Sequence, residues 1–458
     1  MMNGTGGRRM YNKKLFDYLM ELIQNKDFVN YRKEIRKLNV IDAAEFMEDI
    51  PPELLVMSMR LLPKDMSIEV FSEFEVEMQE NLIKQITDRE IDHILKEMYV
   101  DDLVDMLEEL PAGLVIDILE RVDPSYRNLI NRFLQYEEDT AGSVMTIEYT
   151  SLKKTMTVAE AIDYLRENGH DSETIYSCYV IDASRVLEGV ITLRTLLLTD
   201  DQECIEKIID KKVISVHTDE DVENVADLFN KYDFMTLPVV DSENRLVGII
   251  TVDDVIDIIQ EEDTEDFEKM AGTLPSDKPY LKTSVWKLAK NRMGWLVLLM
   301  LSGTITALIL TEFEDAFLVI PVLVTFIPML TDTGGNSGAQ SSTLIIRGMV
   351  LHEIETKDLF KVLFKELKVS LMAGSFLALI TYIRLILTYP DKPLIVFVVS
   401  IAILATVIIA KLVGALLPFF AKIIKADPAI MAAPLITTIV DAASLLVYFY
   451  LARMILHI

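Results

Sequence analysis

A run of small and polar residues, Pro328-Met-Leu-Thr-Asp-Thr-Gly-Gly-Asn-Ser-Gly-Ala-Gln340, interrupts an otherwise apolar segment in the last third of the chain. Polar backbone at membrane depth is tolerated only where protein or a water-filled cavity satisfies it. A second polar element, Asp427-Pro428, opens another apolar segment, which carries Thr437 and Asp441. Two such elements in one membrane domain predict an ion pathway.

Hydropathy predicts five membrane spans, because each apolar segment is long enough to cross a bilayer core that needs roughly 20 residues. The spans are residues 293–311, 316–345, 367–388, 394–420 and 429–456. Basic residues gather in the connections on one side of these spans, and acidic residues gather on the other. The positive-inside rule therefore predicts a multi-pass protein of the cell membrane with a cytoplasmic N-terminus and an extracytoplasmic C-terminus.

The negative charge of the chain lies outside the spans. Of its 72 acidic and 44 basic residues, residues 285–458 carry 11 and 14, so the first 284 residues hold 61 and 30, a net charge near −31. Such a surface repels nucleic acid and concentrates cations. The two cysteines, Cys178 and Cys204, are too few for a disulfide framework or a cysteine-based metal cage. We expect cations, and no nucleic acid, as partners.

Patterning divides the chain into four parts and predicts a multidomain protein. Residues 1–140 show helical periodicity and predict an acidic all-α repeat domain, in which Phe46-Met-Glu-Asp-Ile-Pro51 recurs as Met106-Leu-Glu-Glu-Leu-Pro111. Strands and helices alternate twice in residues 141–262, which predicts an α/β domain of two copies. Residues 263–284 form an acidic connecting helix, and residues 285–458 form the α-helical membrane domain.

The two α/β copies end in similar runs, Leu187-Glu-Gly-Val-Ile-Thr-Leu-Arg-Thr-Leu196 and Leu246-Val-Gly-Ile-Ile-Thr-Val-Asp-Asp-Val255. Together they resemble a tandem pair of cystathionine-β-synthase (CBS) regulatory repeats. The resemblance implies that Thr251 and Asp254 can hold a nucleotide ribose. The first copy has threonine where the acid would stand, so ATP binding stays an open alternative to an ordinary strand–turn–helix corner.

The membrane motifs, Gly334-Gly335-Asn336-x-Gly338-x-Gln340 and Asp427-Pro-Ala429…Pro434-x-x-Thr437…Asp441, follow a CBS pair and a helical domain. This arrangement resembles the MgtE family of magnesium channels over nearly the whole chain. The resemblance implies a homodimer with a pore between its two membrane domains, where Asp441 of each chain selects the ion. Mg²⁺ loses its water reluctantly, so a conducting site does better to hold the hydrated ion. Asn336 and the backbone near Ala433 and Thr437 are the further expected pore ligands.

The resemblance also implies feedback by cytosolic Mg²⁺, which would be both transported and regulatory. Carboxylates that repel one another without the ion would be bridged by it, and the connecting helices would then close the pore. The matching residues are Glu69, Asp101, Asp105, Asp221, Glu223, Asp233, Asp254, Asp257, Glu262, Glu265 and Asp266.

Two other interpretations stay open. An ion-coupled secondary transporter of divalent cations, such as Mg²⁺ and Co²⁺, would use intramembrane charges such as Lys411 or Arg384. Either of these side chains could instead form a structural ion pair with Asp441. A membrane-anchored nucleotide sensor would explain the CBS pair but would leave Asp441 without a role. The five histidines are scattered, so no enzyme active site is predicted.

Overall fold

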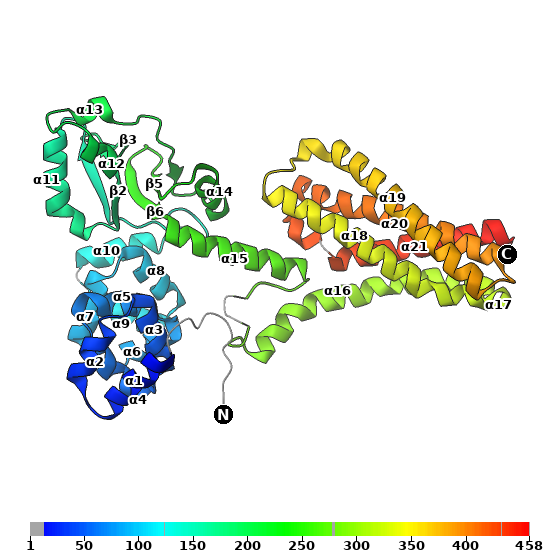
Figure 1. The fold of residues 1–458 in the computed structure, drawn as a ribbon, viewed down its shortest axis with the longest axis horizontal. Coiled ribbons are helices and arrows are strands. Elements are labelled where there is room, and N and C mark those ends of the chain that lie inside the picture. The colour runs from blue at the N-terminus through cyan, green and yellow to red at the C-terminus, as the bar shows by residue number, and fades with distance from the viewer. Residues whose placement is uncertain (1–12, 123, 277–279, 432, 458) are drawn as a thin grey trace. The chain divides into compact units, whose positions relative to one another are not determined.

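A computed structural model describes residues 13–122, 124–276, 280–431 and 433–457. The chain forms two compact units, residues 1–259 and residues 260–458 (Figure 1). Each unit is described by itself.

Short helices make up the first part of the first unit. They are α1 (Lys13–Gln24), α2 (Phe28–Ile35), α3 (Val40–Asp49), α4 (Pro52–Leu61), α5 (Lys64–Ser72), α6 (Val76–Ile83), α7 (Asp88–Glu97), α8 (Val100–Glu109), α9 (Ala112–Arg121) and α10 (Pro124–Phe133). The predicted repeat is confirmed, because α3 and α8 have equal lengths and each ends just before a proline that precedes the next helix. Pro51 and Pro111 occupy the N-cap positions of α4 and α9.

The predicted α/β copies follow, and each contains a three-stranded sheet. The elements are β1 (Tyr149–Lys153), α11 (Val158–Asn168), β2 (Thr174–Ile181), β3 (Leu187–Thr192), α12 (Leu193–Leu198), α13 (Ile205–Ile208), β4 (Val216–His217), α14 (Val222–Tyr232), β5 (Thr236–Val240) and β6 (Leu246–Thr251), with the 3-10 turn η1 (Gly169–Asp171) after α11. In each sheet the first strand runs parallel to the second, and the second runs antiparallel to the third. The hydroxyls of Tyr179 and Thr236 are 2.8 Å apart and join the two copies.

The helical domain and the second α/β copy share one apolar core. Val100 and Val104 of α8 are fully buried in the same cluster as Val225 of α14 and Val255. Because α8 begins at this contact, its first-turn residues lie beside the second copy. The placement of Asp101 and Asp102 follows from it.

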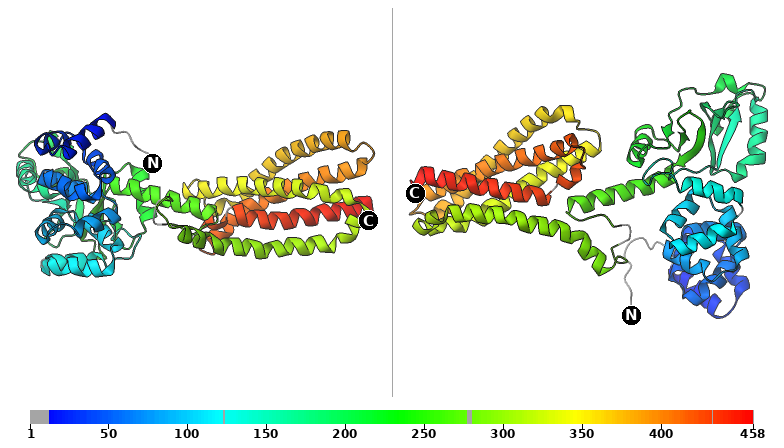
Figure 2. Two further views of the ribbon diagram at one scale, coloured as in Figure 1. Left: turned by 90° about the horizontal axis from the view of Figure 1, so that it is seen from below. Right: turned by 180° about the vertical axis from the view of Figure 1, so that it is seen from behind.

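Helix α15 (Val252–Met270) begins directly after β6 and continues into the second unit. The connecting helix therefore begins and ends earlier than predicted, since it starts at the end of the α/β domain and ends at Met270 rather than at residue 284. The second unit adds α16 (Val285–Glu312), α17 (Glu314–Val319), η2 (Pro321–Phe326), α18 (Ile327–Val350), η3 (Thr356–Asp358), α19 (Leu359–Thr388), α20 (Pro393–Ile423), η4 (Pro428–Met431) and α21 (Ala433–Leu456). Its long helices run side by side (Figure 2).

Four helical segments among the described residues are long and apolar enough to cross a membrane. They are Val285–Glu312, Thr356–Thr388, Pro393–Ile423 and Pro428–Leu456. The predicted span 316–345 is not among them, and this stretch is divided into α17, η2 and α18. Five spans are therefore not confirmed by length and hydropathy.

The prediction that the Gly-rich stretch interrupts its segment was wrong, because α18 is helical from residue 327 to residue 350. Its glycines serve close packing. A Cβ on Gly338 would lie 2.6 Å from Cγ2 of Ile436, and one on Gly414 of α20 would lie 2.2 Å from the carbonyl oxygen of Gly338. Glycine lowers helix propensity by only about 1 kcal/mol, which tight packing of this helix against α20 and α21 can offset.

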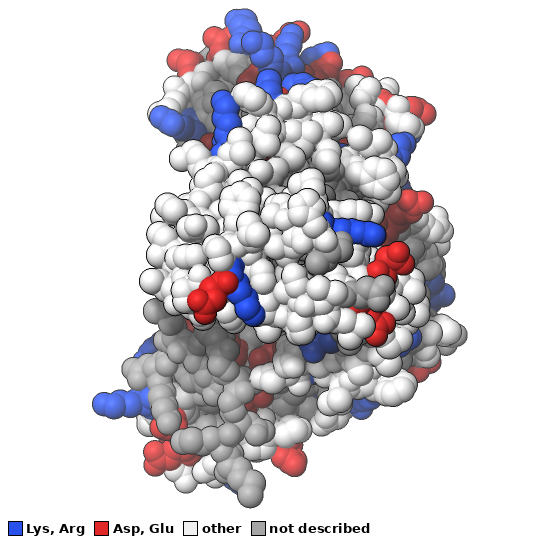
Figure 3. Space-filling model, turned by 90° about the vertical axis from the view of Figure 1, so that its right-hand side faces the viewer, with Lys and Arg blue, Asp and Glu red and all other residues white. Residues whose placement is uncertain are grey.

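Large apolar side chains remain exposed on the outer helices of the second unit. Trp286 and Leu308 of α16, and Met372 and Phe376 of α19, are each more than half exposed. The face at the end where α17 and the C-terminus lie is mostly uncharged (Figure 3). Exposed apolar surface of this extent suits contact with lipid.

Candidate functional site

Helix α18 carries a polar face opposite its packed glycine face. Asp332, Asn336 and Gln340 recur every four residues and are all exposed, whereas Gly334 and Gly338 are buried. The Asn336 amide donates to the carbonyl oxygen of Asp332 at 2.8 Å and to its Oδ1 at 3.0 Å. The predicted ligand Asn336 therefore lies beside a carboxylate that the sequence analysis did not single out.

Helix α21 presents the other predicted pore residues. Asp441 is half-buried, and Thr437 lies one turn before it, so the two share a side of the helix. The Thr437 hydroxyl donates to the carbonyl oxygen of Pro434 at 2.9 Å. Ala433 is the first residue of α21.

Helices α18 and α21 run antiparallel, and their contacts fix the register. The Ser342 hydroxyl donates to the carbonyl oxygen of Met431 at 3.2 Å. A Cβ on Gly335 would lie 2.9 Å from Cγ2 of Thr437, and one on Gly334 would lie 2.8 Å from Cγ1 of Val440. The packing thus brings the predicted pore residues of both helices to neighbouring levels.

The proposed ion pairs of Asp441 with Lys411 or Arg384 are not formed. Lys411 of α20 is 6% exposed and donates to the Ser341 hydroxyl at 3.3 Å, which in turn donates to Oε2 of Glu366 at 2.6 Å. Arg384 contacts the sulfur of Met329 at 2.9 Å. Lys411 and Arg384 therefore contact other residues than Asp441.

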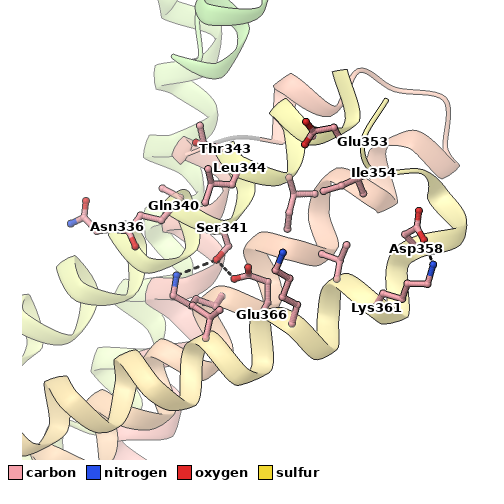
Figure 4. A pocket seen from close by; sticks show the side chains of 17 residues that line it. Asn336, Gln340, Ser341, Thr343, Leu344, Glu353, Ile354, Asp358, Lys361 and Glu366 are labelled. Carbon is pink, nitrogen blue, oxygen red and sulfur yellow. Dashed lines mark hydrogen bonds and ion pairs between the residues drawn. The ribbon is translucent and has the colours of Figure 1, made fainter. Parts of the chain in front are cut away.

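The Lys411 chain of hydrogen bonds lies in a pocket of 1160 Å³ that is lined by residues of α18, α19 and α20 (Figure 4). Asn336 lies at its edge, and its amide points away from Ser341 and Glu366. Gln340 of the same polar face also lines this pocket.

Asp427 caps the start of η4, because its Oδ1 accepts from the backbone N–H of Ala429 at 2.7 Å. Its other oxygen pairs with Lys269 of α15 at 2.8 Å, and Lys269 also pairs with the predicted sensor residue Glu265. Burial lowers the pKa of Lys269, but the hydrogen bonds to Asp427 and Glu265 outweigh it, so the pKa is raised. An ion pair thus ties the connecting helix to the segment that opens α21.

Carboxylates gather where α8 meets the second α/β copy. Asp101 is 9% exposed, and burial raises its pKa well above the usual range, with further increases from Asp102 and Asp254. Burial also raises the pKa of Asp254, while the hydrogen bond from Thr251 partly opposes the rise. The structure therefore brings together the predicted sensor residues Asp101 and Asp254.

Two further acids complete this carboxylate cluster, which we define as Asp101, Asp102, Glu173 and Asp254. Burial raises the pKa of Asp102 to about 6, with contributions from Asp254 and Glu73. Burial raises that of Glu173 to about 7, again with a contribution from Asp254. Sequence analysis missed Asp102 and Glu173, although the Asp101-Asp102 pair at the start of a helix was a visible signal.

The other predicted sensor residues are distributed along several elements. Asp221 caps α14 by accepting from the Glu223 N–H at 2.9 Å, and Asp233 ends that helix with a φ of 54°. Glu69 lies in α5, Asp105 in α8 and Asp257 in α15, whereas Glu262, Glu265 and Asp266 lie in the part of α15 that belongs to the second unit. Within the described residues, no three acidic, histidine or cysteine side chains are arranged to hold a metal ion.

The two nucleotide-type corners differ as expected. The Thr251 hydroxyl donates to Oδ2 of Asp254 at 2.6 Å. In the first copy, the hydroxyls of Thr192 and Thr195 are 2.9 Å apart. Only the second corner thus combines a hydroxyl with a carboxylate.

Comparison with known families matches each part of the chain. A family described as a divalent cation transporter, MgtE, matches residues 327–451. The MgtE intracellular N domain matches residues 38–139, and the CBS domain matches residues 141–199 and 205–261.

Individual relatives match over almost the whole length. The magnesium transporter MgtE of Thermus thermophilus is 37% identical over 97% of this chain and 99% of its own. The one from Bacillus subtilis is 32% identical over 95% of this chain and 96% of its own.

Solved structures match the first half. The soluble part of a magnesium transporter aligns with a TM-score of 0.52 and 32% identity, over 55% of this chain and 98% of its own. The cytosolic domain of the Mg²⁺ channel MgtE in complex with ATP aligns with a TM-score of 0.50 and 38% identity, over 53% of this chain and 99% of its own. The chain is a multi-pass membrane protein that belongs to the MgtE family of magnesium transporters.

Proposed function

We propose that two copies of this chain form a Mg²⁺ channel that admits the hydrated ion down its electrochemical gradient. The observation that carries the proposal is the antiparallel packing of α18 on α21, which brings Asn336, Thr437 and Asp441 to neighbouring levels. A carboxylate, an amide and backbone oxygens, including that of Ala433, suit the shell of a hydrated hard cation. Because one chain supplies a single Asp441, a second copy would complete the ring.

The experiment is Mg²⁺ influx into proteoliposomes that contain a Mg²⁺-sensitive dye. Asp441→Asn keeps the shape of the side chain and removes its charge, so we expect flux to fall on the order of tenfold or more. Asp391→Asn removes one charge from an exposed connection and serves as the matched control. Equal flux in Asp441→Asn and wild type would refute the assignment.

We further propose that cytosolic Mg²⁺ closes this channel by binding at the carboxylate cluster and along α15. Four buried or half-buried acids, whose pKa values are raised by burial and by neighbouring carboxylates, gain most from a cation that shares their charge. The Lys269–Asp427 pair would pass the resulting movement of α15 to α21. The test is limited proteolysis across a Mg²⁺ titration, with K⁺ added to match the ionic strength. We expect Mg²⁺ to protect residues 258–284 from cleavage. Protection that depends on ionic strength alone would contradict this sensor.

The Thr251–Asp254 pair makes ATP a second cytosolic ligand, since a relative's cytosolic domain is known in complex with ATP. Asp254 would then belong both to the carboxylate cluster and to the nucleotide corner. The orientation we propose keeps residues 1–284 in the cytoplasm and the C-terminus outside, because the basic connections share one side of the membrane.

A carrier is the second candidate, and buried Lys411 is the observation that favours it. A secondary transporter would move its intramembrane charges during alternating access. Single-channel currents through wild-type protein separate the two, because a carrier gives no unitary conductance steps.

A further inference from the structure

We propose that Asp332 is a second ion-selecting carboxylate of this protein, which forms one acidic layer of the ion path together with Asp441. The inference deepens the proposed channel function and rests on it. The Asn336 amide and the Thr437 hydroxyl form the next layer toward the cytosol, which is neutral.

The first argument is the exposure of Asp332 within a helix packed among membrane spans. An ionised carboxylate in lipid is strongly unfavourable, so such residues face a water-filled cavity or another protein surface. Asp332 is exposed on the same face as Asn336 and Gln340, four and eight residues later. This stripe therefore faces water or a second copy of the chain.

The second argument is the register of the two helices. Ser342 pairs with Met431, Gly338 contacts Ile436, and Gly334 contacts Val440. Asp332 lies two residues before Gly334 in α18, and Asp441 lies one residue after Val440 in α21. Because the helices are antiparallel, Asp332 and Asp441 lie at nearly the same level. Accordingly, the Asp332 carboxylate is near enough to act electrostatically on that of Asp441.

The third argument is that the side chain of Asp332 is held in place. The Asn336 amide donates to both its carbonyl oxygen and its Oδ1, and leaves Oδ2 for another donor, such as a water of a hydrated cation. A preorganised carboxylate binds more strongly than a mobile one because less side-chain freedom is lost.

A buried hydroxyl lies near this layer, on the side of α21 that packs against Gly334. Ser444, one turn after Asp441, is 0% exposed and has no hydrogen-bond partner among the described residues. Its Oγ lies 3.1 Å from the point that a Cβ on Gly334 would occupy. An unpartnered buried hydroxyl calls for a water, and this one lies against the glycine face of α18 rather than on the face that carries Asp332.

The consequence is a change in the charge that meets the ion. Each chain contributes two carboxylates to the layer, and a second copy makes four. Four carboxylates around a hydrated ion favour a divalent cation over K⁺, because the attraction scales with the charge of the ion.

The test compares Asp332→Asn, Asp332→Glu and the exposed control Asp391→Asn in proteoliposomes. We expect Asp332→Asn to raise the Mg²⁺ concentration for half-maximal flux on the order of tenfold and to increase K⁺ permeation relative to Mg²⁺. Asp332→Glu should restore most of the divalent preference, which a purely structural role would not. Unchanged affinity and selectivity in Asp332→Asn, alongside lost flux in Asp441→Asn, overturns this inference and leaves the channel intact.

A second measurement covers the case in which Asp332→Asn does not fold. In Asp332→Cys, on a Cys204→Ser background, a water-soluble sulfonate-bearing thiol reagent should react at the introduced thiol, and Mg²⁺ should slow the reaction. The other cysteine, Cys178, is buried. Absence of reaction, or a rate unaffected by Mg²⁺, overturns the inference, whereas absence of Mg²⁺ flux in wild type would overturn the proposed function itself.

Discussion

Neutralising Asp102 should stabilise the metal-free first unit. Burial and the neighbouring acids raise its pKa from 3.8 to about 6. At 1.36 kcal/mol per pKa unit, a rise of about 2 units corresponds to at most about 3 kcal/mol of unfavourable free energy at pH 7.5. For a domain of this size, 1 kcal/mol shifts Tm by roughly 2–4 °C, so Asp102→Asn should raise Tm by at most about 6–12 °C.

The assay is thermal unfolding of a soluble fragment of residues 1–259 with a chelator present. Asp117→Asn is the matched control, because Asp117 is an exposed acid in α9 and its loss changes the net charge equally. Mg²⁺ should then stabilise wild type more than Asp102→Asn, since the variant has lost one anionic ligand of the carboxylate cluster.

The pH dependence gives an independent check of the sign. When the pKa of a carboxyl is higher in the folded than in the unfolded chain, the folded chain holds the proton up to a higher pH. The stability of the fold is therefore greatest at low pH and falls as the pH rises. For Asp102 and Glu173 the fall should run from about pH 4 to about pH 7. A Tm for Asp102→Asn no higher than that of Asp117→Asn, with an unchanged pH profile, would refute the reasoning.

Two further predictions concern the second unit. Gly414→Ala should destabilise the membrane domain by about 1–3 kcal/mol in thermal unfolding in detergent, because its Cβ would lie 2.2 Å from the carbonyl oxygen of Gly338. Gly303→Ala, where the added Cβ has open space around it, should have little effect in the same assay. In flux measurements, Lys269→Met should raise the cytosolic Mg²⁺ concentration for half-maximal closure several-fold, because it removes the cation shared by Asp427 and Glu265. Lys357→Met breaks an exposed ion pair and should leave that concentration unchanged.

Local pattern predicted the soluble elements well. Strands and helices alternate twice in residues 141–262 as predicted, and the Phe46 and Met106 repeat segments lie at matching places in α3 and α8. These elements combine period, capping and turn signals, as in Thr157 and Glu160 at the start of α11. Such elements can be predicted from one sequence, because their local conformational preferences agree with their packing in the fold.

The helix through the Gly-rich motif was not predictable in the same way. The small and polar residues of this stretch suggested an interruption, whereas close packing against Gly414 and Ile436 favours a continuous helix. The carboxylate cluster was only partly predictable, because it unites α8 with a loop residue, Glu173, and the start of α15. Such proximity depends on how distant segments pack, which residue spacing does not encode.

The contact between Lys411 and α18 bears on how the membrane domain is made. Helix α18 carries two charged residues, two amides and several hydroxyls, and it falls outside the segments that are apolar enough to span a membrane alone. Helix α20 is strongly apolar but contains Lys411, whose hydrogen-bond partners lie on α18, earlier in the chain. During synthesis, α18 would therefore stay at the bilayer surface until α20 has been synthesised. The two helices would then insert together, so that insertion is cooperative rather than sequential. Chains truncated after α18 should leave that helix outside the bilayer in glycosylation mapping, and chains that extend through α20 should not.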